Sequence, residues 1–360
     1  MSVNNLPLAE KTNIKKWPFE DLVLTDVTAP AVDLSALNVT DNTVVIVDGH
    51  VVHNQVDVNL TVETTIKQHP AENKLLVLNN EKQNSALKIT VPKNVTVEAP
   101  LSVIVISKER SLVHGTELTL ETGASLNYTE SFIGQGTYNA NITSQFHVGE
   151  NANLTTNTIS ELAAGTVVYH HKHADVAANG VLDGTNFMIN DTDLVFEDLT
   201  FLNGQGSEAE TKTVSIASGK QKQNLTIRIE NVGKRSIGNI INYGITKDVA
   251  HLAFNGVGKI QKDAKDCDNQ QETRLLNLSK TAEAVANPFL LIDEGDITAG
   301  HAASIGQLDE EQIYYLMSRG MARAEASKMI VSGFLTPFVD ALDDEKMREE
   351  LQMRIEAKLG

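Results

Sequence analysis

Cysteine is nearly absent from this chain of 360 residues, which contains only Cys267. A single thiol excludes an intrachain disulfide, and it excludes a metal site built from cysteines of this chain alone. Cys267 stands in "KDAKDCDNQ", where the carboxylates of Asp266 and Asp268 disfavour its thiolate form. We therefore expect Cys267 to be a structural residue and not a nucleophile.

The chain also lacks long apolar runs and an excess of positive charge. No run of about 20 apolar residues occurs, and the start "MSVNNLPLAEKTNIKKWPFEDL" lacks the basic segment and apolar core of a signal peptide. This predicts a cytoplasmic protein. The 47 acidic and 30 basic residues give a formal net charge of −17, which repels phosphate backbones and anionic lipid surfaces. Nucleic acid and membranes are not expected partners.

Aromatic residues make up only 5% of the chain, whereas Val, Ile, Thr and Asn recur through most of it. This composition favours short strands over helices. Runs such as "NTVVIVDGHVV", "NKLLVLNN" and "ALKITVPKNVTVEAPLSVIVIS" are separated by Gly, Asn and Asp. They predict a mainly β body from about Val45 to Ile292.

Three segments with turn residues recur at near-constant spacing. "KNVTV" begins at Lys93, "TGASL" at Thr122 and "ENANL" at Glu150, so the offsets are 29 and 28 residues. Such spacing predicts the coils of a β-solenoid, in which each coil buries its inner face against its neighbours. The paired glycines of "FLNGQGSEAE" and "FNGVGKIQKD" are interpreted as further solenoid turns. The alternative is chance similarity among the strands of a β-sandwich.

Helical periodicity replaces the β pattern after His301. In "LDEEQIYYLMSRG", Asp309 is a candidate N-cap, Gln312 completes a capping box and Gly320 ends the helix. "ARAEASKMIVSGFLTPFVDAL" and "DDEKMREELQMRIEAKL" carry apolar residues at helical spacing. We expect a lead-in over residues 1–40, a β core over 41–302 and a helical domain over 303–360. The apolar stripes serve either packing on the protein's own core or docking of a partner.

Common catalytic motifs are missing, since the sequence has no G-x-x-x-x-G-K-[ST], H-E-x-x-H or G-x-S-x-G. "VVYHHKHADV" gathers His170, His171 and His173. On a strand, His171 and His173 lie on one face and His170 on the other, so at most two imidazoles converge. A polar, solvent-facing strand is favoured over a metal site, although carboxylates from Asp175 or Asp183 would add to one.

Short motifs in a fixed order run through the chain from Tyr243 onward. They are Phe254 with Gly256, Asp263-Ala264, Gln271, the run from Leu275 to Ser279, Pro288, His301, Gly306-Gln307 and Ser318-Arg319-Gly320. In this order they resemble the SufB/SufD family of iron-sulfur cluster assembly proteins. "EKTNIKKWPFEDL" resembles more weakly the Trp-containing lead-in of that family.

The resemblance implies a right-handed parallel β-helix with a C-terminal helical domain. It implies a non-catalytic scaffold subunit that pairs with a SufB-like chain and binds a SufC-like ABC ATPase, with a homodimer through the β-helix edge as a further possibility. Ala302 stands where the SufB-like pattern has glutamate, which points to the SufD-like branch, and Ala299 stands where many SufD-like members have cysteine. A β-helical polysaccharide-active enzyme and a purely structural dimerisation subunit without ligand are the competing hypotheses.

His301 is the candidate metal ligand of the chain. A neutral imidazole suits iron, but a cluster normally needs four ligands, mainly thiolates. We therefore expect that the chain holds no cluster alone, and that His301 completes a transient site shared with a partner chain. The alternative is a packing histidine at the junction between the β core and the helices.

The first predicted helix carries candidate contacts for the ATPase. Aromatic, Met and Arg side chains are enriched at the centres of protein interfaces. The candidates are Gln312, Tyr314, Tyr315, Met317 and Arg319.

Overall fold

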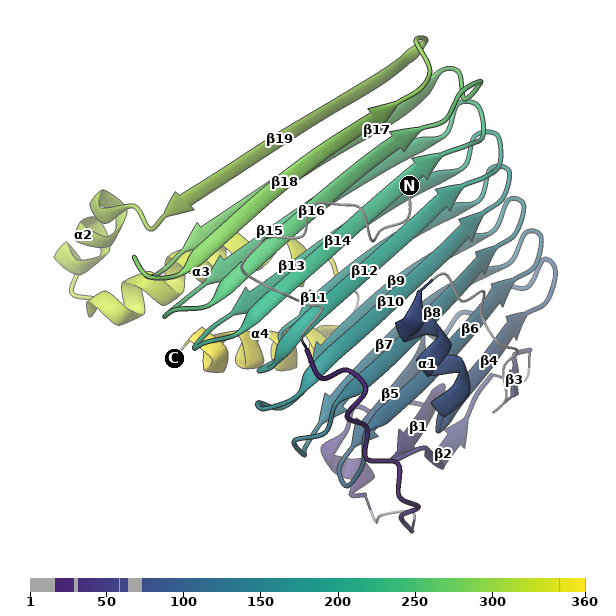
Figure 1. Cartoon of the computed structure of the whole chain (residues 1–360), viewed down its shortest axis with the longest axis horizontal. Helices are drawn as coiled ribbons and strands as arrows, with labels where there is room; N and C mark the ends of the chain where they lie inside the picture. Colours follow the sequence, from purple (N-terminus) through teal and green to yellow (C-terminus); the bar gives the residue numbers. More distant parts are fainter. Residues whose placement is uncertain (1–16, 29–31, 58, 64–72, 343, 360) are drawn as a thin grey trace.

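The chain folds as a parallel β-solenoid with helices on its two outer faces (Figure 1). The structure is a computed structural model that describes residues 17–28, 32–57, 59–63, 73–342 and 344–359. From β4 onward, successive strands alternate between two facing sheets, and strands adjacent within a sheet pair in parallel register apart from β1 with β2 and β3 with β4. The solenoid and the helical tail predicted from the sequence are confirmed, and the sandwich alternative is wrong.

The first sheet, here sheet A, has ten strands in the described part of the chain, in the order β19-β17-β15-β13-β11-β9-β7-β5-β1-β2. Their bounds are β1 Thr43–Val47, β2 His50–Gln55, β5 Leu101–Ser107, β7 Ser125–Gly134, β9 Asn153–Glu161, β11 Val181–Met188, β13 Glu208–Ala217, β15 Ile237–Thr246, β17 Cys267–Asn277 and β19 Ile297–Gln307.

The second sheet, sheet B, has nine strands in the same described ranges, in the order β18-β16-β14-β12-β10-β8-β6-β4-β3. Their bounds are β3 Thr61–Glu63, β4 Ser85–Val91, β6 Leu112–Leu120, β8 Ala140–Val148, β10 Val167–Val176, β12 Asp193–Leu202, β14 Lys222–Asn231, β16 His251–Ile260 and β18 Glu283–Ile292. The helices are the 3-10 turn Leu34–Ala36, α1 Lys74–Lys82, α2 Glu310–Ser318, α3 Arg323–Val339 and α4 Glu345–Leu359.

The predicted turns stack on one another at one corner of the solenoid. Asn94, Gly123 and Asn151 have left-handed φ values of 59°, 71° and 55°. The N–H of Asn94 donates to the Thr122 carbonyl at 2.9 Å, and that of Gly123 donates to the Glu150 carbonyl at 2.8 Å. Asn and Gly tolerate this backbone conformation best, which explains their recurrence in the sequence.

Two local predictions were wrong. "NKLLVLNN", expected to be a β run, forms α1, because the Asn73 side chain caps the helix by accepting from the N–H groups of Leu75 and Leu76. "FNGVGKIQKD", expected to be a turn, lies mostly within β16. Its glycines, Gly256 and Gly258, make room for amide side chains that reach across from β17.

Helices pack on part of the outer face of each sheet (Figure 1). On sheet B, Asn79 of α1 is buried and donates to the carbonyl groups of His114 and Asn141, each at 3.0 Å. On sheet A, α3 and α4 bury apolar side chains against the strands, and the ring of Phe338 lies 4.5 Å from that of Tyr243. The stripes of α3 and α4 therefore serve packing on the protein's own core.

Charged and titratable side chains are buried between the sheets. Lys172 lies 3.7 Å from the Asp198 carboxylate and donates to Thr158 at 3.1 Å, and Thr158 donates to Glu130 at 2.9 Å. His170 also points inward, between the edges of two phenylalanine rings at 5.2 and 5.3 Å, and neither of its ring nitrogens has a partner in the described ranges. Burial holds the pKa of His170 well below its ordinary value. His170 is neutral in the folded protein.

We expect His170→Leu to make the protein more resistant to acid. Because the folded-state pKa of His170 is depressed, its burial adds no pH-dependent cost above pH 6.5, and it destabilises the protein increasingly as the pH falls below that value. The cost is about 1.4 kcal/mol for each pH unit below 6.5. Thermal melts of wild type and variant from pH 8 to 5 should show a difference in stability that widens towards pH 5. Equal pH dependence in both proteins would contradict this account.

Candidate functional site

The two ends of the solenoid differ. The N-terminal end is bordered by the antiparallel strands β2 and β3. At the C-terminal end, β18 and β19 are the last strands of their sheets, and neither has a further strand beside it among the described residues. Figure 1 shows β19 at the margin of the solenoid, with α2 beyond its end. We call the surface formed by β18 and β19 the open end.

His301 lies in the middle of β19, on the side of the strand that faces the interior of the open end. Its position follows from the register, since His301 is paired with Gln271 of β17 and β17 buries alternate residues including Cys267 and Gln271. Ile297 and Ala299, on the same side of β19 as His301, contact Cys267 and its neighbours. No further coil covers His301, and its side chain is exposed.

The structure does not support a packing role for His301 at the junction with the helices. The strand continues to Gln307, and α2 begins only at Glu310, so His301 is not at a strand end. No hydrogen bond to its ring is found in the described part of the chain. The imidazole is therefore available to a ligand or to another chain.

The single cysteine, Cys267, lies next to Ile297 and Ala299 of β19 but is buried. Cys267 is 1% exposed, and its Sγ donates to the Gly233 carbonyl at 3.2 Å and lies 3.3 Å from the Ser236 hydroxyl. This agrees with the structural role expected for it. In the described residues, no group of three or more His, Cys, Asp or Glu is arranged to hold a metal ion.

Gln271, paired with His301, connects β17 of sheet A to β18 of sheet B. Its Nε2 donates to the Phe289 carbonyl of β18 at 2.8 Å. Its Oε1 is buried, has no donor among the described residues, and approaches Gly256 so closely that a Cβ there would lie 2.7 Å away. Gln271 thus fixes the spacing of the two sheets beside His301. The sequence placed Gln271 in a motif but gave it no role, because a contact between two sheets depends on register.

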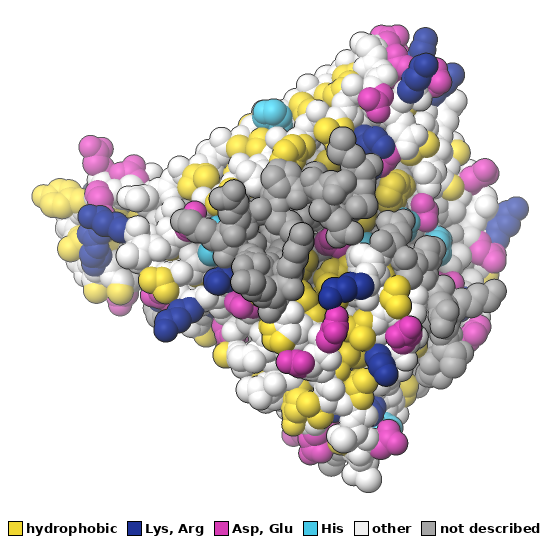
Figure 2. Space-filling view, in the orientation of Figure 1, with side chains coloured by type: hydrophobic (Ala, Val, Ile, Leu, Met, Phe, Trp, Pro, Cys, Tyr) yellow, Lys and Arg dark blue, Asp and Glu magenta, His cyan; other side chains and the backbone are white. Residues whose placement is uncertain are grey.

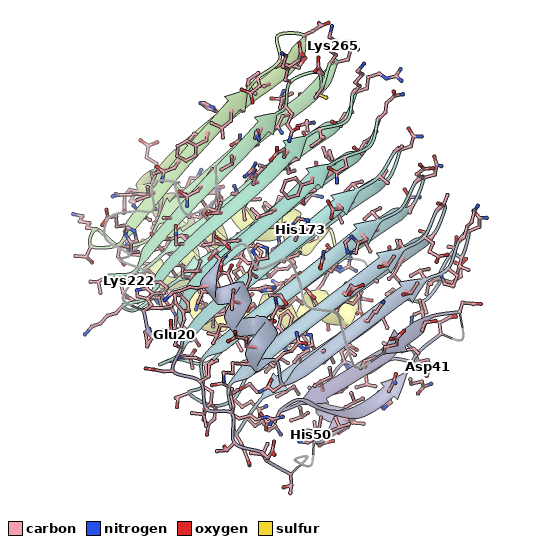
Figure 3. All side chains as sticks on the ribbon, turned by 45° about the vertical axis from the view of Figure 1, so that its right-hand side comes forward. Glu20, Asp41, His50, His173, Lys222 and Lys265 are labelled. Atoms are coloured by element: carbon pink, nitrogen blue, oxygen red, sulfur yellow. The ribbon has the colours of Figure 1, made fainter. Side chains whose placement is uncertain are left out.

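The histidines of β10 divide between the two faces of the strand as predicted, but the prediction of a solvent-facing strand was wrong, since no residue of β10 is exposed. On the outer face of sheet B, His171 Nδ1 lies 3.1 Å from a Glu197 oxygen, which also accepts from the Tyr169 hydroxyl at 2.7 Å. His173 contacts Asp175 at 3.1 Å and is labelled in Figure 3, whereas Asp183 lies on the other sheet and pairs with Lys212.

The candidate partner contacts lie on α2, which projects from the solenoid (Figure 1). Asp309 caps the helix as predicted, and Ile313 is its buried residue. The side chains of Tyr314, Tyr315 and Met317 are 75%, 57% and 43% exposed. Figure 2 shows apolar side chains at this tip of the molecule, next to charged ones. Gln312 and Arg319 are exposed as well, and the Arg319 guanidinium lies over the Tyr315 ring, 5.3 Å from its centroid.

Comparison with known families shows to which family this chain belongs. The family model described as "SUF system FeS cluster assembly, SufBD core domain" matches residues 103–334. The chain belongs to the SufB/SufD family. It is 38% identical over 296 residues to the iron-sulfur cluster assembly protein SufD of Bacillus subtilis, a match that covers 80% of this chain and 67% of that protein. This places it in the SufD-like branch.

More distant relatives of this SufD-like chain are SufBD family proteins of staphylococci. That of Staphylococcus saprophyticus is 25% identical over 298 residues, and that of Staphylococcus haemolyticus 26% over 302 residues. Each match covers 81% of this chain but 64% of the relative, so the matched part spans less than two thirds of these relatives.

No helix in the described ranges is long and apolar enough to cross a membrane.

Proposed function

We propose that this SufD-like chain is a non-catalytic scaffold subunit of a SUF-type iron-sulfur cluster assembly complex. In this proposal the open end pairs with a SufB-like β-helix chain, α2 binds a SufC-like ATPase, and the cluster is cargo held between chains. The supporting observation is the position of His301, an uncovered imidazole at the end of a solenoid that a further strand can extend. Membership of the SufB/SufD family argues against the polysaccharide-active enzyme. The cytoplasmic location stays a prediction.

The cluster would be shared because this chain offers few ligands at the open end. Beside His301 on the interior side of β19 stand Ala299 and Ala303, and the enclosed Cys267 donates its thiol hydrogen to a carbonyl. Iron in a cluster needs mainly thiolate ligands, so the remaining ones would come from the partner. A purely structural subunit without ligand is the outcome that the following experiment distinguishes.

We expect His301→Ala to lower the iron and sulfide content of each assembled complex by about tenfold or more, since even outer ligand contacts are worth that much. The yield of complex should stay unchanged, because an exposed side chain contributes little to the fold. His301→Cys supplies a softer iron ligand and should restore part of the loss. Ser304→Ala is the matched control, because Ser304 is also exposed and lies on β19 three positions after His301. Equal cluster content in wild type and all three variants would show that His301 is not a ligand and would favour a purely structural subunit.

The ATPase contact is proposed for α2 because its large apolar side chains have no cover in the described part of the protein. Tyr and Met side chains exposed together on a projecting helix suit a partner groove. α3 and α4 are less suitable, since their apolar faces are already buried on sheet A. Their removal would uncover buried side chains such as Phe187, Val214 and Ile245, so truncation after Gly306 would confuse loss of binding with loss of folding.

We expect the double change Tyr314→Ala with Tyr315→Ala to weaken retention of a co-expressed SufC-like ATPase by about 30-fold, since anchor residues of an interface contribute at least about 2 kcal/mol. The melting temperature should stay the same because both rings are exposed. Met353→Ala is the matched control, because Met353 of α4 is 62% exposed but lies outside α2. If the double variant retains the ATPase as well as the wild type does, α2 is not part of the interface.

A further inference from the structure

A cleft lies on the outer face of sheet A, in the N-terminal part of the solenoid. It has a volume of about 280 Å³, near the lower end of the range for ligand sites. Strands β5, β7 and β9 form its floor, and the start of α4 and the residues just before β1 stand at its sides. Because β9 is five places from β19 in the sheet, roughly 24 Å separate the cleft from the open end. The cleft is therefore independent of the site described above.

The floor of the cleft is a grid of polar side chains on neighbouring strands. Ser102 of β5 is paired with Thr129 of β7, which is paired with Asn157 of β9. Two residues earlier on β7 and β9, Asn127 is paired with Thr155. All five line the cleft, and none of their side chains has a hydrogen-bond partner in the part of the chain that the structure describes. The hydroxyl and amide groups of the grid are therefore free to bind a ligand.

Thr129 distinguishes this grid from an ordinary solvent-facing sheet. Its side chain lies at the centre of the row and is only 6% exposed, yet its hydroxyl is among those without a partner in the described ranges. A hydroxyl so enclosed is stabilised by a bound partner. Two residues farther along β5 and β9, beside α4, the outward residues are the apolar Ile104 and Ile159. Polar side chains are thus gathered where the cleft is and give way to apolar ones beside the helix.

The cleft carries negative charge. Asp41 and Asp344 line it, and none of the described lining residues is Lys, Arg or His. Asp41, labelled in Figure 3, is exposed and accepts one long hydrogen bond, from Gln55 at 3.4 Å. Arg354 of α4 lines only the smaller adjoining cavity and is paired with Glu161 at 2.8 Å. A phosphate or carboxylate ligand would meet no positive charge in the cleft, whereas a cation would be attracted.

The walls of the cleft are apolar. Pro100, Leu342 and Met347 line it above the polar floor. Such walls suit methylene groups, as the stems of long charged side chains show when they lie along apolar surface. An ammonium group donates up to three hydrogen bonds and accepts none, so hydroxyl, amide and carboxylate oxygens are its natural partners. The walls, the floor and the charge together suit an alkyl chain that carries ammonium groups.

We propose that this cleft binds a linear aliphatic polyamine. Its ammonium groups are held by the Asp41 carboxylate and by the side-chain oxygens of Thr129 and Asn157, and its methylene groups lie along Met347. Asp41 is the main charged partner, because Asp344 already caps α4 by accepting from the N–H of Met347 at 3.0 Å. This inference goes beyond the proposed function and does not rest on it.

Two other classes of ligand fit the cleft less well. A sugar would use the polar floor but would leave the two carboxylates without a counter-charge. A metal ion is disfavoured because no group of three or more His, Cys, Asp or Glu in the described residues is arranged to hold one. The formal net charge of −17 attracts any polycation to the protein, so specific binding has to be separated from general attraction.

Isothermal titration of the purified chain with spermidine, in an excess of Mg²⁺ at about 0.15 M salt, should show one site. Thr129→Val and Asp41→Asn should each weaken binding by about tenfold, the change expected when one hydrogen bond to a charged group is lost. Asp41→Asn alters only an exposed side chain, so it tests the site even if Thr129→Val lowers the melting temperature.

Each variant has a matched control. Thr185→Val makes the same change on β11, where Thr185 is paired with Asn157 but does not line the cleft. Asp293→Asn removes the same charge at an exposed position just after β18. Both controls should bind spermidine as the wild type does.

Several results would overturn the proposal. One is the absence of binding, or binding that Mg²⁺ abolishes. Another is an equal loss of affinity in Asp41→Asn and Asp293→Asn, which would indicate general charge attraction alone. Binding of sorbitol without binding of spermidine would assign the cleft to a neutral polyol. None of these results bears on the proposed function, because the titration uses the chain without partners and leaves His301 unchanged.

Discussion

The stacking of one coil on the next is the interaction on which this structure depends. Each coil has one strand in each sheet, and neither strand can satisfy its backbone groups or bury its inner face without neighbours. The left-handed turn residues keep the coils in step, because the N–H of Asn94 or Gly123 reaches the carbonyl of the following coil only in that conformation. The stacking stops at β18 and β19, which have no further strand beside them among the described residues, and this is the end at which we propose that the partner binds.

The interior explains why the coils hold one register. Lys172, Asp198 and Glu130 lie in a core that is otherwise largely apolar, and they are connected through Thr158 and Asn186. Burial raises the pKa of Glu130, which shows that its charge is disfavoured there. A slip by one residue would turn these side chains outward and bury others without partners. We interpret the network as a determinant of register more than a source of stability.

The solenoid could be predicted from its turns, because the left-handed backbone of each turn favours Asn or Gly and so repeats these residues at intervals of 28 or 29. The N-cap of α2 could also be predicted, because a helix start favours a side chain such as Asp309 that accepts from backbone N–H groups. The segment "NKLLVLNN" was misassigned as a strand, since a Leu- and Val-rich run fits a strand or a helix. The Asn73 side chain favours the helix only because it accepts from the backbone N–H groups of the first turn, and the sequence does not show that contact. The site was harder to predict. His301 was singled out by resemblance, but its exposure and the Gln271 contact depend on which residues 18 or 30 positions apart lie side by side, and periodicity does not encode this.

The contrast between the two ends of the solenoid sets an order of events during synthesis. The strands that border the N-terminal end are made first, and each later coil can form on the finished one before it, in the direction of translation. β19 is the last strand to leave the ribosome, and α3 and α4, which cover sheet A, follow it. The surface that carries His301 therefore comes into existence only when the rest of the core is complete. A chain that stops before β19 presents no finished open end, so recognition of that end by another protein would also report that the β core is complete.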